Sequence, residues 1–343
     1  MTWKSIRKFA VLAAALALAL LASGALAMTP EEEDAAWKKE PAYGQTIRIG
    51  YNGALCTGSA VIAHAKGFYA AEGIETEVSK YQGDTSLQGD AVGTRKTDVT
   101  CGLIATLLVP AANGVHMKFT NGIHGGCKSL CVLTDSPYNG TKDLEGKTVS
   151  IGTPIGGSDH NIAMRFLKRD GLDPLNSVKF RVTDPGAAVL AMQSGEIAAG
   201  IFSDQFIQKF LADGTLRVIR SLTFDDDFKD ETCCIHAVAS ALCEDSPITV
   251  KKLTRAHERA RQWIMEDPEG AVKIMLENGW ASGDPEKVVA YLKTLDFSVT
   301  DPVTEETLIN VIDDYKSFGI LDEGRDTKEI LSRVWYPVLV EQQ

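Results

Sequence analysis

Basic residues are in the minority in this sequence, and there is no long apolar run beyond its first 27 residues. Lysine and arginine number 35 against 46 aspartates and glutamates, which gives a net charge of −11. An acidic chain is a poor partner for nucleic acid and for anionic membranes. Beyond residue 27, no segment reaches the ~20 apolar residues that a membrane span needs. We therefore expect a chain that does not bind nucleic acid and does not cross a membrane.

The signatures of common hydrolases and of small zinc modules are also missing. Neither HExxH nor GxSxG occurs, so the sequence lacks the usual peptidase and serine-hydrolase motifs. No two cysteines are spaced as C-x2-C, which excludes a zinc knuckle or finger. We therefore predict that the chain is not an enzyme and that it has no cofactor.

The first 27 residues have the pattern of a cleavable secretory signal peptide. Three basic residues precede an apolar run over residues 9–21, and Ala25-Leu26-Ala27 closes it with small residues. No cysteine follows this site, so we expect no lipid anchor. The predicted location is the periplasm.

Residues 147–171, KTVSIGTPIGGSDHNIAMRFLKRDG, read as a buried strand, a glycine-rich turn and an amphipathic helix. The free N–H groups at the start of such a helix can hold a small anion or a polar ligand atom. Residues 45–78 repeat the order of strand, turn, helix and strand. This repetition predicts two similar α/β lobes.

The predicted domain organisation follows from this repeat and from the helical composition after residue 247. Residues 1–27 are the signal peptide and residues 28–44 an N-terminal arm; residues 45–134 and 236–343 form lobe 1, and residues 135–235 form lobe 2. Strands that alternate with helices predict mostly parallel sheets, whose ligands bind at the carboxyl ends of the strands. If the lobes face each other, these ends enclose one cleft that closes around a small ligand by a hinge.

Several phrases together resemble the solute-binding proteins of nitrate, sulfonate and taurine ABC importers. They include AKGFYAAEGIETEV, DLEGKTVSIGTPIGGSDH and WIMEDPEGAVKIMLENG. The resemblance implies a two-lobed periplasmic-binding-protein fold of type II, with a hinge and a helical C-terminal part. It also implies delivery of a small solute to ABC permease and ATPase subunits at the inner membrane. A related branch binds thiamine-pyrimidine precursors, and a eukaryotic relative synthesises that pyrimidine with a cysteine-rich motif.

The cysteines depart from this resemblance, because the chain has seven of them. Thiol and imidazole groups suit thiophilic metals, so Cys56, Cys101, His124 and Cys127 form an alternative metal or organometal site. Other readings stay open: Cys127 can pair with Cys131 if a turn folds between them, and Cys101, Cys233 and Cys243 can be buried core residues. An odd number of cysteines leaves at least one thiol free or paired between chains.

The main prediction is a monomeric solute-binding protein that captures a sulfonate, nitrate or similar small anion. The first alternative is the same role for a soft, thiophilic metal or organometal, and a second is binding or synthesis of a thiamine-pyrimidine precursor. The residues predicted to contact the solute are Asn52, Cys56, Ser59, Cys101, His124, Cys127, Gly157, Ser158, Asp159, His160 and Asp204.

Overall fold

The computed structural model describes residues 28–81 and 87–339. The predicted signal peptide, residues 1–27, lies outside the described residues. The chain divides into two compact units, residues 1–40 and residues 41–343. In the first unit, helix α2 (Pro30–Trp37) begins with a capping box in which Thr29 and Glu32 bond each other's backbone N–H groups. The predicted arm, residues 28–44, therefore contains a helix of two turns.

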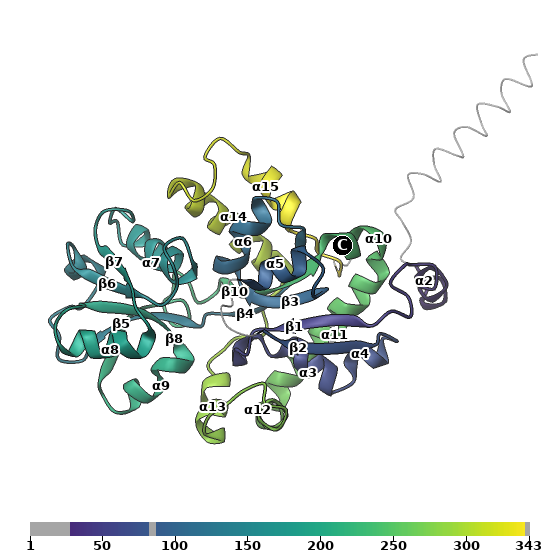
Figure 1. Ribbon diagram of the computed structural model, residues 1–343, viewed down its shortest axis with the longest axis horizontal. Helices are drawn as coiled ribbons and strands as arrows, with labels where there is room; N and C mark the ends of the chain where they lie inside the picture. The colour runs from purple at the N-terminus through teal and green to yellow at the C-terminus, as the bar shows by residue number, and fades with distance from the viewer. Residues whose placement is uncertain (1–27, 82–86, 340–343) are drawn as a thin grey trace, which may run out of the picture. The chain divides into compact units, whose positions relative to one another are not determined.

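The second unit contains two five-stranded mixed sheets (Figure 1). The first has the order β2-β1-β3-β10-β4. Its strands are β1 (Ile47–Tyr51), β2 (Thr76–Lys80), β3 (Val99–Leu103), β4 (Met117–Gly125) and β10 (Thr232–Ala239). Strands β2, β1 and β3 are parallel, and β10 is antiparallel to β3 and β4. A strand from late in the chain thus completes the first sheet.

The second sheet repeats this arrangement with the order β7-β6-β8-β5-β9. Its strands are β5 (Lys128–Leu133), β6 (Thr148–Ile151), β7 (Lys179–Val182), β8 (Ala199–Ser203) and β9 (Leu216–Ser221). Strands β7, β6 and β8 are parallel, and β5 is antiparallel to β8 and β9. The predicted α/β class with two similar lobes is confirmed.

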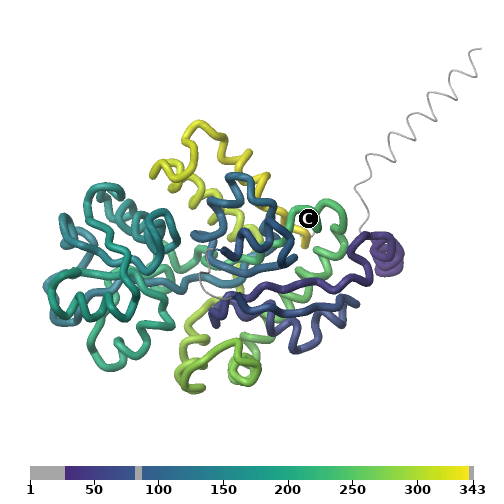
Figure 2. Tube along the Cα trace, viewed as in Figure 1, coloured from purple at the N-terminus to yellow at the C-terminus, as the bar shows by residue number. Residues whose placement is uncertain are grey.

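Helices connect the strands and form the C-terminal part. They are η1 (Leu55–Thr57), α3 (Ser59–Ala65), α4 (Phe68–Ala71), α5 (Gln88–Gly93), α6 (Ile104–Ala112), η3 (Thr141–Leu144), α7 (Ser158–Arg169), α8 (Pro185–Gln193), α9 (Asp204–Ala212), α10 (Ser240–Asp245), α11 (Pro247–Glu266), α12 (Pro268–Glu277), α13 (Pro285–Leu292), α14 (Asp301–Ser317) and α15 (Thr327–Val334). The last two helices lie beside α6, as Figure 2 shows in yellow and dark blue. They pack on the first lobe with Leu107, Phe119, Leu308 and Tyr315 in one apolar core.

The chain crosses between the two sheets twice, at different residues from those predicted. The first crossing is Gly126-Cys127, between β4 and β5, and the second is residues 222–231, between β9 and β10. Residues 128–133 fall within the predicted first lobe, whereas this strand pairs in the second sheet. Apolar composition alone does not distinguish these neighbouring strands.

Gly126 is the residue at which the first crossing turns, and only glycine fits there. Its φ angle is +60°, and an added Cβ would lie 2.4 Å from the Cα atom of Thr223 in the second crossing. We expect Gly126→Ala to lower the free energy of unfolding by about 2 kcal/mol, since it adds both backbone strain and overlap. Gly140→Ala is the control, because its φ of −162° is ordinary and its Cβ would meet no atom within 4 Å. Equal urea midpoints for the two variants would contradict this assignment.

A buried ionic network joins α7 of the second lobe to α14 of the C-terminal part. Arg165 Nε lies 2.7 Å from an Asp314 carboxylate oxygen, and Arg165 Nη1 lies 2.8 Å from Glu231. The Arg165 side chain is only 6 % exposed. Lys168 reaches the other Asp314 oxygen at 2.7 Å, but its side chain is 41 % exposed. Arg165 is therefore the central cation of a contact between the lobes.

Candidate functional site

The turn after β1 contains the predicted ligand residues Asn52, Cys56 and Ser59. Two of its polar side chains form hydrogen bonds within the protein. Asn52 Oδ1 accepts hydrogen bonds from the Ala54 N–H at 3.0 Å and from the Thr57 hydroxyl at 2.7 Å. Its amide nitrogen donates to the Cys101 carbonyl at 3.2 Å. Asn52 therefore holds the turn in place against β3.

Ser59 is also part of a buried internal network. Its hydroxyl lies 2.9 Å from His236 Nε2, and the His236 ring stacks on His257 with centroids 3.8 Å apart. Burial lowers the pKa of His236 well below its usual value and that of His257 to about 3, so both rings are neutral at pH 7. These contacts give Ser59 a role in packing α3 against β10.

The same turn brings a cysteine into a cluster of soft donor atoms. The ligand atoms of Cys56, His124, Cys127 and Cys234 all lie within 4.8 Å of one another, and all four residues are buried. A fifth sulfur is close, since Cys233 Sγ lies 3.3 Å from Cys127 Sγ. Three members of this cluster were predicted as site residues from the sequence. Cys234 was not.

Strand pairing explains how the cluster forms. Cys234 is the direct partner of His124 across β10 and β4, and the register shift between Thr232 and Cys234 leaves Cys233 as an extra residue in β10. Such bulges re-aim side chains and are frequent beside functional sites. Cys127 follows in the first crossing, and Cys56 comes from the 3₁₀ turn η1. Hydrogen bonds from Cys127 and Cys234 lower the pKa of Cys233, whereas the pKa values of Cys56, Cys127 and Cys234 are raised by hydrogen bonds among these cysteines and by burial.

The imidazole of His124 has one nitrogen in use and one without a partner. Nδ1 lies 3.0 Å from the Gly125 carbonyl oxygen, which can only accept, so Nδ1 carries the proton. Nε2 is buried and makes no hydrogen bond with the residues that the structure describes. The Nε2 lone pair is therefore available to a ligand among the three sulfurs.

Cys101, the fourth member of the predicted metal set, lies outside this cluster. It is fully buried in β3, where it pairs with His236 across the strands. Burial raises the pKa of the Cys101 thiol, which keeps it neutral. Its place fits the alternative reading of a small core residue.

The turn before α7 contains the predicted ligand residues Gly157, Ser158, Asp159 and His160, and several of its N–H groups form hydrogen bonds within the turn. Gly156 donates to His160 Nδ1 at 3.3 Å, Gly157 to the Pro154 carbonyl at 2.8 Å, and Asp159 to Thr153 Oγ1 at 3.1 Å. No such bond is described for the Ser158 N–H group among residues 28–81 and 87–339. Among the first three N–H groups of α7, only that of Asp159 has a described hydrogen bond, because none is described for Ser158 or His160.

Charge and packing around this turn also bear on its ligand. The buried Asp159 carboxylate pairs with Lys128 at 2.7 Å and accepts the Gly152 N–H at 3.0 Å. The His160 ring packs edge-on against Phe180 with centroids 4.6 Å apart, and burial lowers the pKa of His160. A carboxylate at this helix start opposes the binding of an anion.

Asp204 lies where the second lobe meets the cysteine cluster. Its backbone N–H donates to the Cys127 carbonyl at 2.9 Å, and its carboxylate accepts from Ser129 at 2.6 Å and from the Thr223 hydroxyl. Burial raises the pKa of Asp204. The residue thus links α9 to both crossings.

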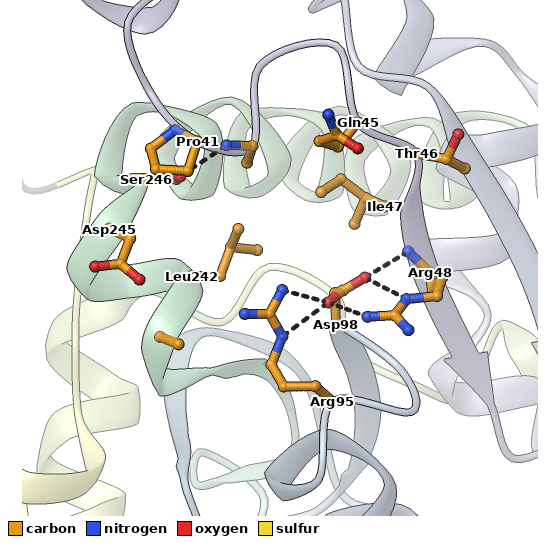
Figure 3. Close-up of a pocket in the computed structure, with 12 residues that line it drawn as sticks. Pro41, Gln45, Thr46, Ile47, Arg48, Arg95, Asp98, Leu242, Asp245 and Ser246 are labelled. Carbon is orange, nitrogen blue, oxygen red and sulfur yellow. Dashed lines mark hydrogen bonds and ion pairs between the residues drawn. The ribbon is translucent and has the colours of Figure 1, made fainter.

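A pocket lies elsewhere, in the first lobe. It has a volume of about 280 Å³, and its lining includes Arg48, Arg95, Asp98 and Ser246. Figure 3 shows both arginines directed at Asp98, which they contact at 2.9 and 3.2 Å. None of the predicted ligand residues lines this pocket, and its central charges are already paired.

Comparison with solved structures identifies the fold. The chain is similar to the aliphatic sulphonate-binding protein SsuA of Escherichia coli, with a TM-score of 0.70 and 18 % identity over 87 % of this chain and 94 % of the other. It is similar to SsuA of Xanthomonas axonopodis bound to MOPS, with a TM-score of 0.68 and 17 % identity over 86 % and 99 %. The nitrate-binding protein NrtA of Synechocystis gives a TM-score of 0.68 and 17 % identity over 84 % and 86 %. The predicted periplasmic-binding-protein fold is confirmed.

Sequence comparison gives the family. No curated protein sequence matches the chain significantly. The NMT1-like family model matches residues 40–276, which is more than half of the chain. The chain belongs to the NMT1-like family.

Proposed function

We propose that this chain is the extracytoplasmic solute-binding protein of an ABC importer. The observation that carries the proposal is the two-lobed fold with paired crossings, because it matches binding proteins over more than four-fifths of the chain. The predicted signal peptide supports export. Among the described residues, no helix is long and apolar enough to cross a membrane. A role in solute capture rather than catalysis agrees with the nature of these structural relatives.

The proposed mechanism is capture of a small solute between the lobes, followed by delivery to permease and ATPase subunits. The lobes are linked by two short crossings, so rotation about Gly126-Cys127 and residues 222–231 would open and close the space between them. A monomer suffices for this mechanism, since both lobes come from one chain.

The charges around the turn before α7 do not favour the small anion that the sequence predicts as the solute. Asp159 and Asp204 are buried acidic residues of the second lobe, and the nearby Lys128 is already paired with Asp159. The turn before α7 also engages the N–H group of Asp159, through Thr153 Oγ1. These features favour a neutral or cationic solute over sulfonate or nitrate.

A binding panel tests the proposed function directly. The mature chain is mixed with sulfonates, nitrate, a thiamine-pyrimidine precursor and thiophilic metal ions, and thermal unfolding is followed. A true solute should raise the melting temperature, because ligand at 100 times its Kd stabilises the native state by about 2.7 kcal/mol. Small-angle scattering should then give a smaller radius of gyration with that solute. An unchanged radius with a solute proven to bind would contradict capture by closure.

A further inference from the structure

The buried cluster at the two crossings has a composition that ordinary packing does not require. It presents three sulfurs and one imidazole nitrogen within 4.8 Å of one another, from Cys56, His124, Cys127 and Cys234. Side-chain exposure is 8 % or less for each residue. Cys56 comes from η1, His124 and Cys127 come from β4 and the crossing that follows it, and Cys234 comes from β10. Three separate parts of the chain therefore converge on one point.

The buried imidazole of His124 supports a ligand at this point. A buried polar atom without a hydrogen bond destabilises a protein, and such atoms call for an explanation. Here Nδ1 donates to the Gly125 carbonyl and Nε2 is buried; burial lowers the pKa of the ring, but the neighbouring Cys56 thiol raises it. Metal-binding histidines have this arrangement, in which one ring nitrogen bonds a backbone carbonyl and the other coordinates the ion.

From this convergence we infer that Cys56, His124, Cys127 and Cys234 bind one thiophilic metal ion of the Zn²⁺, Cd²⁺ or Cu⁺ type. Three sulfurs and one nitrogen form a tetrahedral donor set that zinc uses in structural sites. Tetrahedral bonds of about 2.0–2.3 Å place ligand atoms roughly 3.4–3.8 Å apart. The observed upper limit of 4.8 Å therefore requires only a small contraction when the ion binds.

The donor set selects soft ions over hard ones. Sulfur and imidazole ligands favour zinc, cadmium and copper(I), whereas Ca²⁺ and Mg²⁺ need oxygen ligands. The nearby Asp204 carboxylate is held by Ser129 and Thr223 and is outside the four-residue set. Cys233 Sγ, at 3.3 Å from Cys127, can take the place of one of the sulfur donors.

The position of the site connects it with solute capture. Cys127 lies in the first crossing, Cys234 follows the second, and the Asp204 N–H of the second lobe bonds the Cys127 carbonyl. Movement of the second lobe therefore acts on the metal site through the backbone of Cys127. The claim that the ion is the transported solute rests on the proposed function. The claim that the four residues bind an ion is independent of it.

The test is a titration of the reduced mature chain with Cd²⁺, whose thiolate complexes absorb in the ultraviolet. One equivalent should bind and release protons from the coordinating thiols. Cys234→Ser and Cys56→Ser should each weaken the affinity about 100-fold or more, since a hard oxygen replaces a soft donor. Cys101→Ser is the matched control, because Cys101 is equally buried but outside the cluster, and its affinity should stay within about twofold.

Competition with Zn²⁺ and Cu⁺ then ranks the ions, and circular dichroism verifies that each variant is folded. No binding of any of the three ions to the reduced chain would overturn the proposal. Equal loss of affinity in Cys101→Ser and Cys234→Ser would overturn the assignment of the ligands. A chain that ignores these ions but is stabilised by a sulfonate would keep the importer role and lose the metal site. Metal binding as predicted, with unchanged metal uptake in cells that lack the chain, would keep the site and contradict only the claim that the ion is the transported solute.

Discussion

Replacing Arg165 with methionine is expected to lower the free energy of unfolding by about 3–5 kcal/mol. The substitution leaves Asp314 and Glu231 without the guanidinium that contacts them at 2.7 and 2.8 Å. Both carboxylates are mostly buried, so water cannot replace the lost partner fully. The apolar stem of methionine fills much of the space, which separates the loss of charge from the loss of packing. Urea unfolding of the two proteins at pH 7 measures the difference.

Lys168→Met is the matched control for this effect. Lys168 contacts the same Asp314 carboxylate at 2.7 Å, but its side chain is 41 % exposed. Exposed ion pairs contribute about 0–1 kcal/mol, so the control should cost less than about 1 kcal/mol. Equal losses of stability in the two variants would show that burial does not determine how much the Arg165 ion pairs stabilise the protein. A stable Arg165→Met protein would contradict the role of this network in joining the lobes.

Lowering the pH from 7 to 5 is expected to cost about 4 kcal/mol of stability through His236 and His257 together. Burial lowers the pKa of His257 to about 3 and that of His236 well below its usual 6.5. In the unfolded chain these two histidines bind protons as the pH falls through about 6.5, whereas in the folded chain they stay neutral. This contribution is fully present above pH 6.5, and it is lost as the pH falls towards the folded pKa values.

The double variant His236→Gln/His257→Gln tests this pH dependence. Glutamine keeps hydrogen-bonding groups for the Ser59 and Tyr69 hydroxyls, which lie 2.9 and 2.7 Å from the two rings. Its stability should fall by about 4 kcal/mol less than that of the wild type between pH 7 and pH 5. His116→Gln is the control for the substitution itself, because His116 is exposed and lies outside the stacked pair of His236 and His257. Identical slopes for wild type and double variant would contradict the pKa directions.

Much of the fold is visible in local patterns of the sequence. The period-two strand around Val149 and Ile151 and the helix beginning at Ser158 both occur where the pattern predicts them. The lobe boundary was less predictable, since β5 and β4 are both apolar and only their partners distinguish them. The pairing of β10 with β4 joins residues more than 100 positions apart, which a local pattern cannot encode.

The candidate site shows the same division between local and long-range information. Cys56, His124 and Cys127 were predicted because each falls in or near a turn at the end of a strand. Cys234 was missed because its position depends on the register and the bulge of β10. Cys101 was included because it lies near a strand end, yet its side chain belongs to the buried face of β3. The Cys233-Cys234 pair at the start of the returning strand was the signal that could have been followed.

The most direct test of the central claim is native mass spectrometry of the exported chain, isolated without reductant or chelator. The account predicts a mass that corresponds to the mature chain with one thiophilic metal ion and with protons missing from the coordinating thiols. Denaturing spectra of the same sample should then show Cys56, Cys127 and Cys234 as free thiols. A metal-free chain in which Cys127 is joined to Cys233 by a disulfide, as their 3.3 Å separation would permit after a small shift, would contradict the soft-metal site.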